Sequence, residues 1–134
     1  MKNILSNREN RESNLIFDHS LSFLEFIMLE SKFQAKLIKE LEDRFPGCIV
    51  MKTDANYIQG FPDLLILYQD RWAALEGKRS ENASHRPNQD YYVDLLNQMS
   101  FASFIFPENK EEVLNDLERS FGTGSRRNSR ISRR

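Results

Sequence analysis

Histidine, cysteine and long hydrophobic runs are scarce in this sequence of 134 residues. Two histidines, His19 and His85, and one cysteine, Cys48, are too few for a zinc site of the usual kind, and a single cysteine allows no internal disulfide. No run approaches the roughly 18 apolar residues of a membrane-spanning helix, and the first residues lack the apolar segment of a signal peptide. These shortages predict a cytoplasmic protein with no membrane partner and no zinc centre.

Charge is distributed unevenly along the chain. The segment 122–134 contains five arginines and no acid. Because the whole chain has a net charge of −1, residues 1–121 must carry −6. Because residues 1–121 are mildly acidic, we expect the basic segment 122–134 to be the part that binds a polyanion. We expect residues 122–134 to form a disordered basic tail.

The first 29 residues form a segment of their own in this interpretation. Residues 1–14 are polar without periodicity, which predicts a mobile stretch. Residues 15–29 are strongly apolar, and Ser20 is a suitable N-cap for a helix there. Such a helix has more apolar side chains than are needed to pack one of its faces against the rest of a small domain. Either it packs on its own domain or a second copy of the chain covers it in a homodimer.

The clearest helix is expected from Glu30 to Phe45, where apolar residues recur every four positions and Pro46-Gly47 supplies a stop signal. Counting back by three from Phe33 places Glu30 on the inward face. Its carboxylate either interacts favourably with the helix dipole or joins acids elsewhere in the fold.

The remaining apolar segments predict an α/β domain over residues 30–121. We expect strands at 48–53, 64–68, 72–75 and 101–106, and helices at 88–99 and 109–121. The order is α-β-β-β-α-β-α. Strands joined through a helix imply a mixed central sheet of about four strands, flanked by helices.

Two acids and a lysine are expected to meet at one end of this sheet. Side chains alternate faces along a strand, so Glu76 and Lys78 point the same way. If the second and third strands form a hairpin, Asp63 lies next to Glu76. Paired carboxylates without histidine suit a hard ion such as Mg²⁺ or Mn²⁺, and a neighbouring lysine can hold an attacking water. These groups together would suit metal-assisted hydrolysis of a phosphodiester.

These residues resemble the PD-(D/E)XK nuclease superfamily. Pro62-Asp63 is followed after twelve residues by Glu76-Gly77-Lys78, and Gly60-Phe61-Pro62-Asp63 is similar to the G-x-P-D form of the motif. Glu30 and Gln34 resemble the first-helix E-x-x-x-Q spacing, and Arg86-Pro87-Asn88-Gln89 resembles the glutamine-bearing start of the second helix. The combination is most similar to virus-type replication-repair nucleases and to phage endonuclease I and archaeal Holliday-junction resolvases.

The resemblance implies a restriction-endonuclease-like core and assigns roles within it. Asp63 and Glu76 would bind Mg²⁺, for which Mn²⁺ can substitute, with the Gly77 carbonyl as a further ligand. Lys78 would position the nucleophilic water, and Glu30 would bind metal directly or through water. Gln89 would contact the water network or the scissile phosphate.

Further basic residues are candidates for nucleic-acid binding, or else belong to an exposed loop and a solubilising tail. They are His85, Arg86, Arg126, Arg127, Arg130, Arg133 and Arg134.

The expected activity is that of a Mg²⁺-dependent DNA endonuclease without a small-molecule cofactor. Branched DNA is the expected substrate of a junction resolvase, and a nickase is the nearest rival. The short length and the resemblance favour a phage origin, in which case the protein would act in the cytoplasm of a bacterial host. The alternative is a catalytically silent module that retains the fold and binds nucleic acid or protein.

Overall fold

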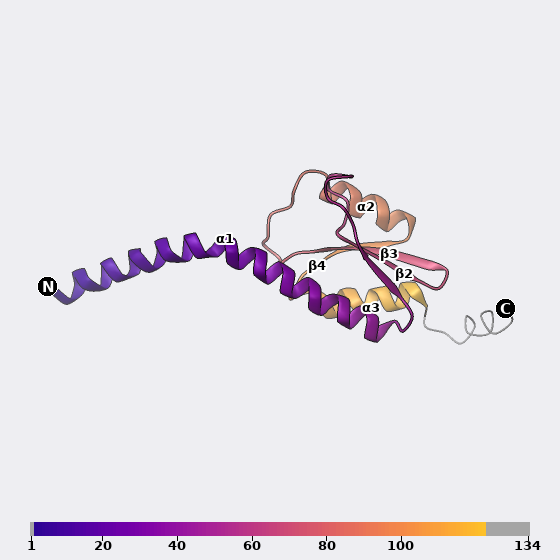
Figure 1. The fold of residues 1–134 in the computed structure, drawn as a ribbon, viewed down its shortest axis with the longest axis horizontal. Coiled ribbons are helices and arrows are strands. Elements are labelled where there is room, and N and C mark those ends of the chain that lie inside the picture. The colour runs from indigo at the N-terminus through magenta and orange to yellow at the C-terminus, as the bar shows by residue number, and fades with distance from the viewer. Residues whose placement is uncertain (1, 123–134) are drawn as a thin grey trace.

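The chain folds in the predicted order α-β-β-β-α-β-α (Figure 1). A computed structural model describes the backbone of residues 2–122 and the side chains of residues 23–122. The elements are α1 (Lys2–Arg44), β1 (Ile49–Lys52), β2 (Leu64–Tyr68), β3 (Arg71–Gly77), α2 (Gln89–Met99), β4 (Phe101–Ile105) and α3 (Lys110–Phe121). The α/β class and the mixed four-stranded sheet are thereby confirmed.

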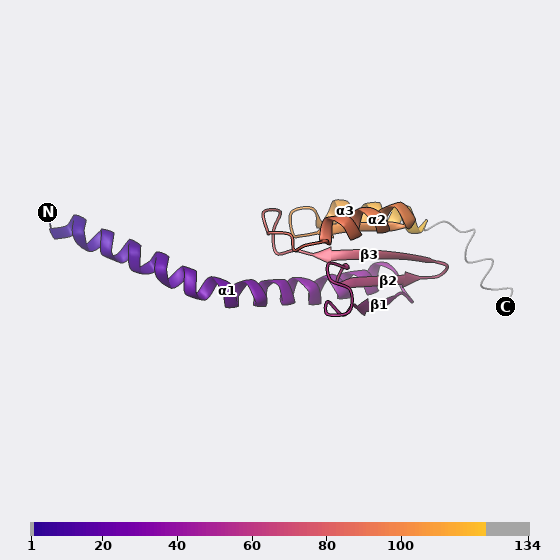
Figure 2. The ribbon, with the colours of Figure 1, turned by 90° about the horizontal axis from the view of Figure 1, so that it is seen from above.

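The first helix is longer than the sequence predicted. One continuous helix, α1, runs from Lys2 to Arg44, so no helix begins at Ser20 or at Glu30. The segment contains neither glycine nor proline, which explains why a serine with cap chemistry does not interrupt it. The helix ends where expected, before Pro46 and Gly47, and Gly47 has a φ of 85°. The N-terminal half of α1 extends past the sheet (Figures 1 and 2).

The sheet has the order β1-β2-β3-β4, with antiparallel pairing between the first three strands and parallel pairing between β3 and β4. A two-residue turn at Gln69 and Asp70 joins β2 to β3, and Leu64 pairs with Leu75. This register places Asp63 opposite Glu76, as the sequence predicted.

Helices cover both faces of the sheet. α1 and α3 lie on one face and α2 on the other (Figure 1). The larger core, between the sheet, α1 and α3, is built from residues such as Leu37, Leu41, Ile66, Leu75 and Leu117. The smaller core joins Ala74 and Ala102 of the sheet to Val93 and Leu96 of α2. Strand alternation therefore directs Leu75 toward α1 and Glu76 toward the start of α2.

The C-terminal helix ends at Gly122, whose φ of 59° is the left-handed conformation that glycine favours at a helix end. The five tail arginines predicted to bind phosphate begin at Arg126 and lie outside the described residues. Within the part of the chain that the structure describes, no helix has the length and apolarity needed to cross a membrane.

Candidate active site

Asp63 and Glu76 are joined by reciprocal hydrogen bonds across the β2–β3 hairpin. The backbone N–H of Asp63 donates to Oε2 of Glu76 at 3.0 Å, and the backbone N–H of Gly77 donates to Oδ1 of Asp63 at 3.1 Å. Each carboxylate is thus fixed by the backbone of the strand that carries the other. The predicted acid pair is present at the end of β3.

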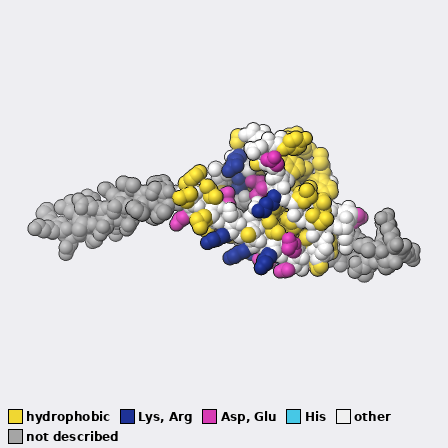
Figure 3. All heavy atoms as spheres, viewed as in Figure 1, with side chains coloured by type: hydrophobic (Ala, Val, Ile, Leu, Met, Phe, Trp, Pro, Cys, Tyr) yellow, Lys and Arg dark blue, Asp and Glu magenta, His cyan; other side chains and the backbone are white. Residues whose placement is uncertain are grey.

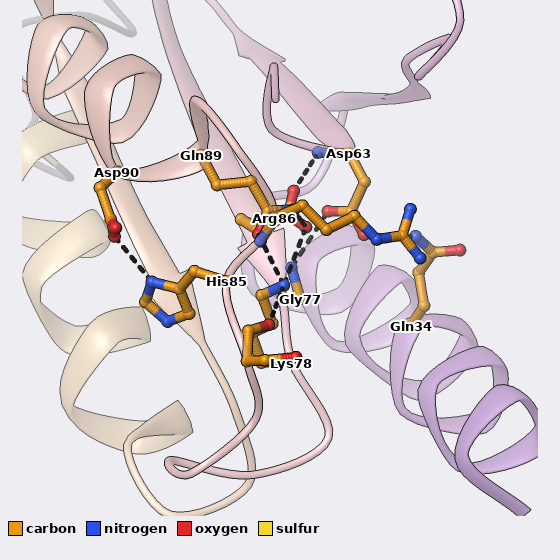
Figure 4. Close-up of polar contacts among 10 residues, drawn as sticks. Gln34, Asp63, Gly77, Lys78, His85, Arg86, Gln89 and Asp90 are labelled. Atoms are coloured by element: carbon orange, nitrogen blue, oxygen red, sulfur yellow. Dashed lines mark hydrogen bonds and ion pairs between the residues drawn. The ribbon is translucent and has the colours of Figure 1, made fainter. Parts of the chain in front are cut away.

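Gln89 connects Glu76 to Lys78. Its Nε2 donates to Oε1 of Glu76 at 2.7 Å, while its Oε1 accepts a 2.7 Å hydrogen bond from Nζ of Lys78 (Figure 4). The Lys78 ammonium also donates to the Ser84 carbonyl at 3.2 Å and lies 3.8 Å from Oε1 of Glu76. Glu76, Lys78 and Gln89 are 7%, 6% and 5% exposed, so the three polar groups form a buried network.

Burial shifts the protonation of both acids. Loss of solvation, followed by repulsion from Asp63, raises the pKa of Glu76 to about 7, although Lys78, the Asp63 amide and Arg86 oppose the shift. Loss of solvation also raises the pKa of Asp63, against the hydrogen bonds from Gly77, its own backbone and Gln34 and the charge of Lys78. Because two neighbouring negative charges repel each other, a cation bound between the two acids would favour the ionised form of both.

Helix α1 contributes Gln34 to the site. Nε2 of Gln34 donates to Oδ2 of Asp63 at 3.1 Å, and Phe33 lies beneath Gly77. Glu30 lies one turn before Gln34 on the same helical stripe and is half-buried. Among residues 23–122, however, no three His, Cys, Asp or Glu side chains come together as a metal-binding group. A role for Glu30 in binding metal therefore remains a prediction.

The loop between β3 and α2 carries two of the predicted nucleic-acid-binding residues, His85 and Arg86. Nδ1 of His85 lies 2.7 Å from Oδ1 of Asp90, and the imidazole stacks on Phe104 with 4.1 Å between ring centroids. The backbone N–H of Arg86 donates to Oε1 of Gln89 at 2.8 Å. The Arg86 side chain is exposed and extends toward the side of the site that holds Asp63 (Figure 4).

Sequence reasoning missed Arg79, the residue after Lys78. Its guanidinium carbon lies 3.4 Å from the centroid of the Phe26 ring on α1. Strand alternation gave no signal for this residue, because β3 ends at Gly77 and Arg79 lies in the bend that follows. The partner could not be predicted, because the helices expected over 15–29 and 30–45 were separate, whereas one continuous helix fixes Phe26 relative to the site.

A tight backbone contact holds the start of α2 against the loop before β2. A side-chain carbon added at Gly60 would lie 2.7 Å from backbone and side-chain atoms of Asn88 and from the Pro87 carbonyl oxygen. Gly60 also has a φ of 88°, which L-residues rarely adopt. Only glycine allows this approach, so Gly60 places Gln89 relative to Asp63.

The donor set at this sheet end suits a hard divalent ion. Asp63 and Glu76 supply carboxylate oxygens from neighbouring strands, and burial is the main cause that raises the pKa of each acid. Oxygen donors with no histidine or thiolate suit Mg²⁺ or Mn²⁺, which retain water and need only one or two carboxylates. On the face shown in Figure 3, basic and acidic side chains are interspersed.

Comparison with known proteins supplies no relative for the chain: no family model, no curated protein and no solved structure matches it.

Proposed function

We propose that the protein is a metal-dependent endonuclease that hydrolyses phosphodiester bonds in DNA. One observation carries the proposal. The buried Lys78 ammonium lies 3.8 Å from Glu76, and the Gln89 side chain forms hydrogen bonds with both groups. Asp63 accepts a hydrogen bond from Gly77 at the same end of β3. An acid pair with an adjacent buried lysine matches the chemistry that phosphodiester hydrolysis requires. The resemblance to the PD-(D/E)XK superfamily supports the same assignment and a restriction-endonuclease-like core.

Asp63 and Glu76 would hold the ion, with the Gly77 carbonyl as a further ligand. A bound Mg²⁺ would polarise a phosphoryl oxygen and lower the pKa of a coordinated water. Glu76 must be ionised to bind metal, so its pKa of about 7 predicts that occupancy rises with pH.

The residues of the chain would orient the remaining reactants. Lys78 would hold the attacking water and stabilise negative charge that forms on the phosphate. Gln89 fixes the ammonium by accepting its hydrogen bond at 2.7 Å. Arg86, exposed beside the acids, would bind a phosphate oxygen through its planar guanidinium.

A four-way DNA junction is the proposed substrate structure, on the resemblance to junction resolvases. The test incubates the protein and Mg²⁺ with a four-way junction, its matching linear duplex and supercoiled plasmid. Preferential cutting of the junction supports a resolvase, whereas equal cutting of all three excludes that preference and leaves a nickase or nonspecific nuclease.

A second copy of the chain would supply the second cut that a junction needs. Large apolar side chains on α1, Phe23, Leu24, Ile27, Met28 and Leu29, are each 50% or more exposed. Such a surface is typical of an interface between protein chains. Sedimentation equilibrium should give a dimer that Ile27→Glu dissociates. A monomeric wild type would exclude the homodimer.

A noncatalytic binding module is the second candidate. It is favoured by the internal hydrogen bond that each oxygen of the acid pair accepts and by the lack of a third carboxylate beside the pair among residues 23–122. Calorimetric titration with Mn²⁺ separates the two functions. A protein that binds DNA but neither binds Mn²⁺ nor cuts DNA is the binding module.

A further inference from the structure

Arg79 is held beside the candidate active site by an aromatic ring rather than by an acid. Its guanidinium lies over the face of Phe26, 3.4 Å from the ring centroid. Among residues 23–122, no carboxylate lies within ion-pair distance of Arg79. Stacking uses the face of a guanidinium and leaves its in-plane N–H groups free to bind an acceptor.

The position of Arg79 relative to the acids follows from α1. Phe26, Glu30 and Gln34 are four residues apart and form one stripe of the helix. Gln34 contacts Asp63 at one end of the stripe, and Phe26 contacts Arg79 at the other. At a rise of 1.5 Å per residue, the eight residues between Phe26 and Gln34 span about 12 Å.

We propose that Arg79, braced by Phe26, binds a backbone phosphate of the nucleic-acid strand to one side of the bond that is cut. The span of about 12 Å along α1 is long enough for this phosphate to be distinct from the one at the acid pair. A planar guanidinium with free N–H groups can bind a phosphate through two hydrogen bonds. The inference rests on the proposed function, because it places the strand in the site of Asp63 and Lys78.

The strand path that follows runs along α1. It begins at Arg79, passes the half-buried Glu30 and reaches the acid pair beside Gln34. The loop residue Arg86 would lie over the phosphate at the acids. Arg79 is thus a binding and positioning residue, whereas Lys78 acts at the reacting phosphate.

The test measures the affinity of a 30-base-pair duplex at several salt concentrations in EDTA, where no metal supports cleavage. Arg79→Ala should weaken binding about tenfold at low salt. It should also reduce the slope of log Kd against log salt concentration by about 0.9, the value for one duplex phosphate contact. Arg119→Ala, which removes the same charge from the distant end of α3, is the matched control and should leave the slope unchanged.

Substitutions of Phe26 test the stacking interaction separately from the charge of Arg79. Phe26→Leu should weaken binding about threefold without changing the salt slope, because Arg79 keeps its charge but loses its stacking partner. Phe26→Tyr, which retains a ring, should bind as the wild type does. A merely structural link between the loop and α1 would lower the melting temperature in Arg79→Ala without moving the slope.

The outcomes separate this inference from the proposed function. If the wild type cuts DNA and Arg79→Ala leaves both KM and the salt slope at the values of the Arg119→Ala control, the phosphate contact is wrong and the nuclease stands. If the slope depends on Arg79 but no cleavage occurs with Mg²⁺ or Mn²⁺, the contact stands and the nuclease is wrong. Failure of the wild type to bind DNA overturns both.

Discussion

The backbone N–H of Asp63 donates a 3.0 Å hydrogen bond to the Glu76 carboxylate, while the Asp63 carboxylate accepts a 3.1 Å bond from the residue after Glu76. This exchange fixes the two acids in place without removing their mutual repulsion. Burial and that repulsion together raise the pKa of Glu76 to about 7. Backbone hydrogen bonds therefore fix the positions of the two carboxylates, whereas burial and mutual repulsion disfavour their joint ionisation.

Stability of the metal-free protein should fall as pH rises. The pKa of Glu76 increases from 4.5 to about 7 on folding, so the folded protein binds this proton more tightly than the unfolded chain. Deprotonation between about pH 4.5 and 7 then opposes folding by about 3 kcal/mol, and the raised pKa of Asp63 acts in the same direction. Chemical denaturation in EDTA at pH 5.5 and 7.5 should detect about 2 kcal/mol of this difference, because the rest is lost below pH 5.5. Glu76→Gln should flatten the pH dependence, and an equally steep dependence in that variant would assign the effect to other groups.

Divalent metal should reverse this trend. Binding needs both carboxylates ionised, so Mn²⁺ should raise the melting temperature more at pH 7.5 than at pH 5.5. Asp63→Asn should abolish the increase, because it removes one charge while leaving an oxygen to accept the Gly77 hydrogen bond. A metal-induced increase that is the same at both pH values, or that survives in Asp63→Asn, would place the metal elsewhere.

Loss of the Gln89 side chain should destabilise the fold and the site together. Gln89→Ala removes the hydrogen bonds that link Glu76, Lys78 and the Arg86 backbone at 2.7 to 2.8 Å. Buried polar groups left without partners cost about 1–3 kcal/mol, which urea unfolding would detect. Gln98→Ala, at an exposed position of the same helix, is the matched control and should change the free energy of unfolding by less than about 0.5 kcal/mol.

Gly60→Ala should be more damaging than Gly47→Ala. Both glycines have positive φ, at 88° and 85°, so both substitutions carry the backbone penalty of about 1 kcal/mol. Only at Gly60 would the new carbon lie 2.7 Å from Asn88 and Pro87, whereas no atom lies within 4 Å at Gly47. The Gly60 variant should unfold at lower urea concentration and, because Gln89 moves with Asn88, should lose affinity for Mn²⁺. Equal effects of the two substitutions would contradict the close contact.

Local patterns were sufficient to predict the sheet and the acid pair. Apolar runs on both sides of Gln69 and Asp70 define the hairpin, and its register brings Asp63 opposite Glu76. Turn residues and period-two alternation act over short distances in the sequence, so they can be recognised without the fold.

The rest depends on contacts between distant segments. The bond from Gln34 to Asp63 and the stacking of Arg79 on Phe26 arise only when α1 packs across the sheet. The start of α1 was misplaced because Ser20 has cap chemistry whether or not the preceding residues are helical. The contact of Gly60 with Asn88 likewise follows from the meeting of two loops.

The most direct test of the proposed chemistry is single-turnover cleavage of a four-way DNA junction with Mg²⁺ by the wild type, Lys78→Met and Lys52→Met. Lys78 is buried in the site, whereas Lys52 is exposed at the end of β1 and controls for the loss of a positive charge. We expect the wild type and Lys52→Met to cut at similar rates and Lys78→Met to be slower by about 10²–10⁴-fold, with Mn²⁺ binding retained. Cleavage by Lys78→Met at the wild-type rate, or no metal-dependent cleavage by the wild type on any DNA substrate, would contradict the assignment of this site as a nuclease centre.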